Sequence, residues 1–462
     1  MCGANEKSGV FVTAFSFCHI IHTVFVAYAA TLHSYLSALD GPIDLHYERD
    51  PAAPSIRRWR HCRDLLSDIP DLTVHTHDTH SLVPFDDYLK KSNNALPASY
   101  GAFCKIFAKL DVVAPRLSPQ TLPPHPQNIP PPPLLPTLAE LPNILPTGGT
   151  DTHFPGGENA ALSRLSSQVS NNIAWTATFE KPKTSPNTLA PSTTALSPYV
   201  THGCLSARTF YAAVLAAQSA HTGSVSQPPV SLVGQLLWRD YNTLFGHVVG
   251  MKFAEMEGND YCRQIPWGAD EVSLALWKEG NTGYPFIDAI MRQLKAEGWI
   301  HHLARHAVAC FLTRGDLWIS WESGAAVFEE RLIDADWSIN AFNWQWLSCS
   351  AHFYQYFRCY SPVAFGKKTD PNGDYIRKWC PELKNVSKKH IYEPWNMSKE
   401  EQKAAKCVIG KDYVERIERI KDHTKVSKSN MEKMSVAYKI HNVAGVKRKK
   451  EQAAGGGGKK QK

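Results

Sequence analysis

The chain has 462 residues, enough for two or three domains with substantial hydrophobic cores. With 43% hydrophobic and 20% charged residues, its composition excludes a largely disordered chain. Most of the net charge of +7 comes from residues 441–462, which hold seven Lys and Arg and one acidic residue, so it does not by itself indicate nucleic-acid binding by the folded part. The eleven cysteines form no C-x-x-C pair, which is typical of reduced thiols rather than of a disulfide framework.

Residues 9–36 contain no Asp, Glu, Lys or Arg. Their length permits a membrane span, and AYA at 27–29 resembles a signal-peptide cleavage site. Because His and Thr side chains interrupt the apolar run, we favour a buried strand and helix of an α/β layer. The alternatives are a targeting segment and a badly defined chain start.

The next region alternates strand and helix patterns. Residues 43–48 and 72–78 predict strands, and residues 53–69 predict a helix between them. A strand–helix–strand order indicates a parallel sheet, so residues 1–112 are interpreted as an α/β domain.

Proline then becomes dense, with twelve of the 31 prolines in residues 115–146. Proline at this density keeps a chain extended, so residues 113–150 predict an interdomain linker. The opposite end, residues 441–462, is Gly-rich and basic and predicts a disordered tail, whose KRKK at 447–450 resembles a nuclear address.

Between these segments, residues 151–440 predict a large all-helical domain. Apolar residues recur at helical spacing and no long strand-like alternation appears. The predicted helices include 231–248, 284–298, 299–314 and 315–334.

The stretch GWIHHLARHAV places three histidines within six residues. On a helix, His302 and His306 lie on one face, a spacing that suits a metal clip, a proton-transfer pair or packed core side chains. A metal site is disfavoured because the H-E-x-x-H frame is absent. Residues 331–346 add two aspartates, two asparagines and three tryptophans, and the aromatic rings could form a core or a chain of redox-active rings beside a cofactor.

Here the sequence resembles the flavin domain of the photolyase/cryptochrome family. The similarity is dense over residues 154–425 and looser over 43–110, and HHLARH is most similar to (6-4) photolyases and animal-type cryptochromes. The matching motifs, in the family's order, are GGENAALSRL (156–165), LSPYVTHGCLS (196–206), GQLLWRDY (234–241), IPW (265–267), TGYPFIDAIMRQL (282–294) and HIYEPWN (390–396).

The resemblance implies a truncated α/β domain followed by a helical domain that binds FAD. It places Arg305 and Asp334 as an ion pair above the flavin ring, Asp336 at the ring edge and Asn340 at flavin N5. Polar and charged groups of this kind set the position and electronics of a flavin. The full set of implied FAD residues is Thr194, Ser197, Gln235, Arg239, His302, Arg305, Asp334, Ala335, Asp336 and Asn340.

The resemblance also gives the tryptophans an order for electron transfer. Trp344 would lie nearest the flavin, followed by Trp321, Trp267 and Trp318. Trp337 and Trp346 are interpreted as packing residues.

The same resemblance implies light-dependent repair of (6-4) pyrimidine–pyrimidone lesions in DNA. Repair moves a hydroxyl and a proton between two bases, so we expect His302 to be the acid, His306 its partner and His301 structural. The implied lesion-pocket residues are Gln235, Trp238 and Tyr360. The candidate DNA phosphate contacts are Lys367, Lys368, Arg377 and Lys378.

Two departures from the family pattern shape the expectations. Asp240 stands where (6-4) enzymes usually have Glu, and the family's opening strand motif is missing, so antenna-pigment binding is doubtful. The leading interpretation is a nuclear, monomeric, FAD-dependent (6-4) photolyase acting on damaged DNA, without a metal and without stable membrane association. The alternatives are a cryptochrome-type light receptor or circadian regulator, and a flavin-poor inactive relative. A targeting segment in residues 1–36 would instead place the protein in an organelle or the cytoplasm.

Overall fold

The computed structural model describes residues 22–39, 41–115 and 153–441. Most of the proline-rich linker, the basic tail and the first part of the uncharged N-terminal segment therefore lie outside the described residues.

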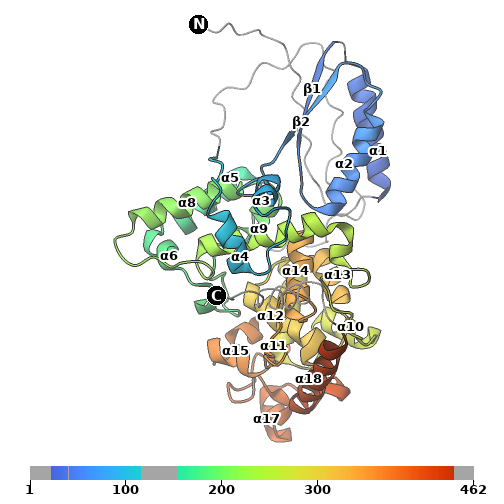
Figure 1. Cartoon of the computed structure of the whole chain (residues 1–462). Coiled ribbons are helices and arrows are strands. Elements are labelled where there is room, and N and C mark those ends of the chain that lie inside the picture. Colours follow the sequence, from blue (N-terminus) through green and yellow to red (C-terminus); the bar gives the residue numbers. More distant parts are fainter. Residues whose placement is uncertain (1–21, 40, 116–152, 442–462) are drawn as a thin grey trace, which may run out of the picture.

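The described N-terminal part contains a small parallel sheet flanked by helices. Strands β1 (Ile43–Glu48) and β2 (Leu72–His77) pair in parallel, and α2 (Ala53–Leu65) connects them. Helix α1 (His22–Ser37) lies with α2 beside the sheet (Figure 1). The crossover was predicted from the alternation of apolar residues and is confirmed. Its small core consists of Leu36, Ile43, Leu45, Leu66 and Ile69.

After β2 the chain passes into the helical part of the molecule. Helices α3 (Phe85–Lys91) and α4 (Tyr100–Phe107) lie near α9 (Leu232–Val249) (Figure 1). They bury Phe85 and Phe103 in a core shared with later helices. The Tyr100 hydroxyl donates to the carbonyl of Gly234 at 3.1 Å. These two helices therefore belong to the larger core rather than to the sheet.

The remainder of the described chain is helical, which confirms the predicted fold class. Between residues 153 and 441 the only β pairings are two isolated bridges, Gly268 with Ile319 and Ile409 with Tyr413. The α-helices there are α5 (Glu158–Leu165), α6 (Ile173–Thr178), α7 (Ser197–Thr201), α8 (Ala207–Ala220), α9 (Leu232–Val249), α10 (Glu271–Glu279), α11 (Pro285–Glu297), α12 (His302–Cys310), α13 (Trp321–Arg331), α14 (Trp337–Leu347), α15 (Ala364–Thr369), α16 (Asp374–Trp379), α17 (Lys399–Ala405) and α18 (His423–Ile440).

Two predicted helices need correction at their ends. The helix predicted from residue 299 begins at His302, because His301 is its N-cap and accepts a hydrogen bond from the Leu303 amide at 3.0 Å through Nδ1. The helix predicted over 315–334 begins only at Trp321, and Trp318 before it has a φ of 52°. Apolar spacing alone did not reveal these caps.

Among the described helices, none is both long and apolar enough to cross a membrane.

Candidate flavin and histidine site

The N-terminal turn of α12 brings His302 and His306 together. Their ring centroids lie 4.2 Å apart, and His306 Nδ1 is hydrogen bonded to the Tyr360 hydroxyl at 3.0 Å. Burial lowers the pKa of His302 well below its usual value and that of His306 to about 3. Both imidazoles are therefore neutral near pH 7, and His302 Nε2 is buried without a hydrogen-bond partner.

Lys181 is the residue at this site that the sequence analysis missed. It opens a short 3-10 helix, η3 (Lys181–Lys183), and its charge depresses the pKa of His301, His302 and His306. Burial lowers the pKa of Lys181 itself to about 7. No local motif signals this placement, because more than a hundred residues separate the lysine from the histidines.

The predicted ion pair is present. Arg305 Nη2 donates to Asp334 Oδ2 at 2.8 Å, and the Asp334 side chain is only 3% exposed. The Ser197 hydroxyl donates to the same oxygen at 2.6 Å, while Arg305 Nε donates to the Ile300 carbonyl at 3.1 Å. Asp334 Oδ1 is buried without a partner, so the carboxylate retains one free acceptor.

Two further predicted flavin residues are fixed to the backbone around α14. Asp336 is the N-cap of this helix, with Oδ1 accepting from the Ile339 amide at 2.9 Å. Asn340 Nδ2 donates to the Ala325 carbonyl at 2.9 Å. Ala335 lies between Asp334 and Asp336 and is half-buried against the core. The structure thus gathers Arg305, Asp334, Asp336 and Asn340 around the start of α14.

Two other residues predicted to bind FAD, Thr194 and Gln235, make hydrogen bonds within the protein. Thr194 is buried, and its carbonyl accepts from Arg164 at 2.9 Å. Gln235 Nε2 donates to the Pro229 carbonyl at 3.1 Å.

Trp238 stacks on Tyr100 with centroids 3.9 Å apart. Among the described contacts, neither Gln235 nor Trp238 has a hydrogen bond or ring contact with His302 or His306. Their assignment to a lesion pocket stays a prediction.

The tryptophans predicted for electron transfer are buried or half-buried. Trp267 and Trp318 lie side by side, with centroids 4.8 Å apart. Trp321 begins α13, and Trp344 lies on α14, the helix packed against it. The other two tryptophans of this region pack in the core, as expected, with Trp346 stacked on Phe353 at 5.0 Å and Trp337 near Phe253 at 6.1 Å.

The four candidate phosphate-binding side chains differ in their exposure to solvent and in their contacts with other protein groups. Lys367 and Lys368 are exposed on α15, close to the loop that carries Tyr360. Arg377, by contrast, is half-buried and donates to the Val386 carbonyl at 2.9 Å, and exposed Lys378 lies over the Trp379 ring at 4.6 Å. The two α15 lysines are the more available pair.

Comparisons with known proteins identify the family of this chain. Residues 232–436 match a family described as the FAD binding domain of DNA photolyase. The chain is 52% identical over 304 residues to Cryptochrome-1 of Gallus gallus, covering 66% of this chain and 48% of that protein. It is 51% identical over 305 residues to Cryptochrome-2 of Gallus gallus, covering 66% and 51%. The chain belongs to the photolyase/cryptochrome family.

This member of the family spans about half the length of the curated relatives it matches. Its fold resembles a solved cryptochrome from Synechocystis with a TM-score of 0.72 and 28% identity, covering 84% of this chain and 78% of that one. It also resembles a bacterial class III photolyase from Agrobacterium tumefaciens, with a TM-score of 0.67, 24% identity and coverage of 89% and 82%. The second similarity supports the fold alone.

The residues of this photolyase/cryptochrome domain fit FAD. A buried carboxylate with one unpartnered oxygen, at Asp334, needs a donor, and a flavin or its ribityl chain carries such groups. The adjacent guanidinium of Arg305 and the amide of Asn340 supply the polar and charged neighbours that tune a flavin.

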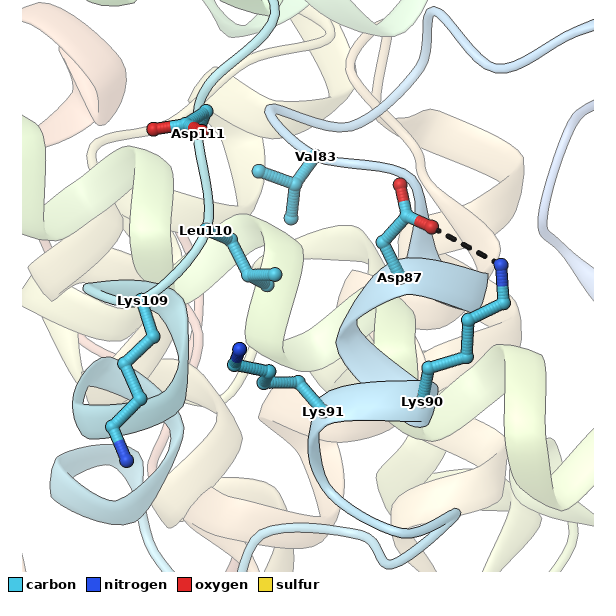
Figure 2. A pocket seen from close by; sticks show the side chains of 7 residues that line it. All are labelled: Val83, Asp87, Lys90, Lys91, Lys109, Leu110 and Asp111. Atoms are coloured by element: carbon cyan, nitrogen blue, oxygen red, sulfur yellow. Dashed lines mark hydrogen bonds and ion pairs between the residues drawn. The ribbon is translucent and has the colours of Figure 1, made fainter.

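A separate surface hollow lies away from these residues. It has a volume of about 450 Å³ and lies between α3 and the end of α4, where the Lys91 side chain reaches toward Leu110 (Figure 2). Its lining consists of Val83, Asp87, Lys90, Lys91, Lys109, Leu110 and Asp111. None of these is a predicted flavin or lesion residue, so the hollow is not part of the candidate site.

Proposed function

We propose that this protein repairs (6-4) photoproducts in DNA in a light-dependent reaction. The observation that carries the proposal is the half-buried pair His302 and His306, joined to Tyr360 and within electrostatic reach of Lys181. When bound, reduced FAD absorbs blue light and supplies the single electron that starts the reaction. We further propose that the protein is a monomer that acts on damaged DNA in the nucleus.

In this proposal His302 gives a proton to the lesion from Nε2, its unpartnered nitrogen. The imidazole is neutral in the protein alone because burial penalises its charge. Phosphates brought in by DNA would favour the charged form, since a nearby opposite charge raises the pKa of a base. Lys181, whose pKa is about 7, is the neighbouring source of that proton.

His306 and Tyr360 have a positioning role. The hydrogen bond of 3.0 Å between them fixes the orientation of the His306 ring, against which the His302 ring lies edge-on. A damaged base must leave the helical stack to reach a buried group. The exposed lysines of α15 would bind the phosphates on either side of the lesion. Such contacts position the protein on the DNA and do not read its sequence.

A second candidate is a cryptochrome-type light receptor or transcriptional regulator without repair activity. The relatives named Cryptochrome-1 and Cryptochrome-2, at 51–52% identity, favour it. The two functions differ in whether the histidine pair is used for chemistry.

The test is repair of a (6-4) oligonucleotide under blue light, expressed per flavin-bound protein. We expect wild type to repair, and His302→Ala to bind FAD and damaged DNA but lose on the order of 10²–10⁴ in rate, the usual cost of removing a positioned acid. Tyr360→Phe, which loses only the hydroxyl bonded to His306, should lose less. Wild type that binds FAD but repairs nothing would favour the cryptochrome function. A His302 variant repairing at the wild-type rate would contradict the proton-donor role.

A further inference from the structure

The segment between β2 and α3 crosses from the sheet to the flavin domain. Arg208 Nε on α8 donates to the Ser81 carbonyl at 2.9 Å, and the Leu82 amide donates to Asp240 Oδ2 on α9 at 2.8 Å. Ser81 and Leu82 are buried. His80 is thereby carried by the N-terminal part of the chain but held against the flavin domain.

Arg239 is hydrogen bonded to His80 through both of its terminal nitrogens. Nη1 donates to the His80 carbonyl at 2.7 Å, and Nη2 lies 2.8 Å from His80 Nε2. Because a guanidinium can only donate, Nε2 must be the acceptor, so His80 is neutral with its proton on Nδ1. Burial, followed by the Arg239 charge, lowers the pKa of His80 well below its usual value, which agrees with this assignment.

Asp336 lies next to this pair. Its Oδ2 is 4.0 Å from His80 Nε2, while Oδ1 is used in capping α14. Burial raises the pKa of Asp336, and the Arg239 charge is the largest effect opposing that rise. The position of Arg239 therefore affects whether Asp336 is a carboxylate.

We propose that His80 is a positioning residue of the flavin site, which acts through Arg239 to keep Asp336 in place at the expected flavin edge. The resemblance places Arg239 among the FAD-binding residues, and in this proposal its part in the site is to support Asp336. His80→Ala leaves the backbone carbonyl in place but removes the side-chain acceptor, so the guanidinium loses one of its two anchors on this residue. The proposal concerns FAD binding and is independent of whether the protein repairs DNA.

The test uses the full chain, stripped of flavin and titrated with FAD. We expect His80→Ala to bind FAD roughly tenfold more weakly, the scale expected for loss of a hydrogen bond to a charged group. We expect the midpoint potential of its bound flavin to shift as well. His80→Gln, whose side-chain carbonyl can accept from Arg239, should recover most of the affinity and the potential.

Arg208→Lys is the matched control, because it weakens the docking of the same segment without touching His80 or Asp336. We expect a lower melting temperature for this variant with near-normal FAD affinity and potential. Wild-type affinity in His80→Ala would overturn the proposal, as would no recovery in His80→Gln. Equal losses in His80→Ala and Arg208→Lys would assign the effect to docking alone and also overturn it.

Discussion

Gly324 offers a test of how tightly Trp344, the tryptophan predicted to lie nearest the flavin, is packed. This glycine lies within α13, and a Cβ built on it would stand 2.2 Å from Trp344 Cη2, 2.5 Å from Cζ3 and 2.6 Å from Leu312 Cδ2. Trp344 and Leu312 are almost fully buried. Gly324→Ala therefore forces an extra methyl group into a filled space.

Two effects of this substitution oppose each other. Replacing glycine by alanine inside a helix stabilises by about 1 kcal/mol, whereas inserting a methyl group into a well-packed core costs roughly 1–3 kcal/mol. Reaching an ordinary contact near 3.4 Å would need the ring to move by about 1.2 Å from the 2.2 Å contact. Because the ring is enclosed, we expect the packing cost to exceed the helical gain, and the free energy of unfolding to fall by up to about 2 kcal/mol.

The assay is urea unfolding of the flavin-free protein, with Gly101→Ala as the matched control. Gly101 lies in α4, and a Cβ added there would meet no atom within 4 Å, so its substitution should stabilise by up to about 1 kcal/mol. Displacement of Trp344 should also slow photoreduction of bound FAD in Gly324→Ala. A Gly324→Ala protein at least as stable as wild type would refute the packing argument.

Asp334→Asn should reduce the flavin absorbance per purified chain more than tenfold, because it leaves the half-buried Arg305 without its counter-charge. Full FAD occupancy in this variant would contradict the assigned role of the Arg305–Asp334 ion pair. His352 is half-buried, and desolvation of its ring lowers its pKa to about 3, so between pH 6.5 and 3 the unfolded chain binds a proton that the folded chain does not bind. This histidine should lower stability by about 2 kcal/mol on going from pH 6.5 to 5, and His352→Phe should show a weaker pH dependence of the urea midpoint; equal slopes would refute the assignment. The hydrogen bond from Cys310 lowers the pKa of Cys359 to about 6. The rate of Cys359 alkylation, followed by mass spectrometry, should therefore be nearly independent of pH above 7 and slow below 6. An alkylation rate that still rises through pH 9 would count against this lowered pKa.

Local sequence pattern was sufficient for the small sheet. Each strand and the helix between them has its own apolar periodicity, so the ends of β1 and β2 were predicted to within one residue. The start of α12 was missed because its cap is a histidine, which is not among the usual capping residues.

The site was predictable only where a motif carried its residues. Arg305 and Asp334 lie in matching motifs, and their ion pair followed from the resemblance. Lys181 and His80 reach the site from distant parts of the chain, through contacts that depend on how helices and the sheet pack. Periodicity and spacing contain no signal for such contacts, since each lysine or histidine taken alone resembles a solvated side chain.

The hydrogen bonds that hold Arg305, Asp336 and Asn340 to main-chain atoms have a consequence for cofactor loading. Each of these side chains is already anchored, to the Ile300 carbonyl, the Ile339 amide and the Ala325 carbonyl. Little rotamer entropy then remains to be lost when FAD enters, so its association should need no slow rearrangement of α12 or α14. Loading would instead be controlled by entry and desolvation of the cofactor, and apoprotein held at low temperature should keep its full capacity for FAD.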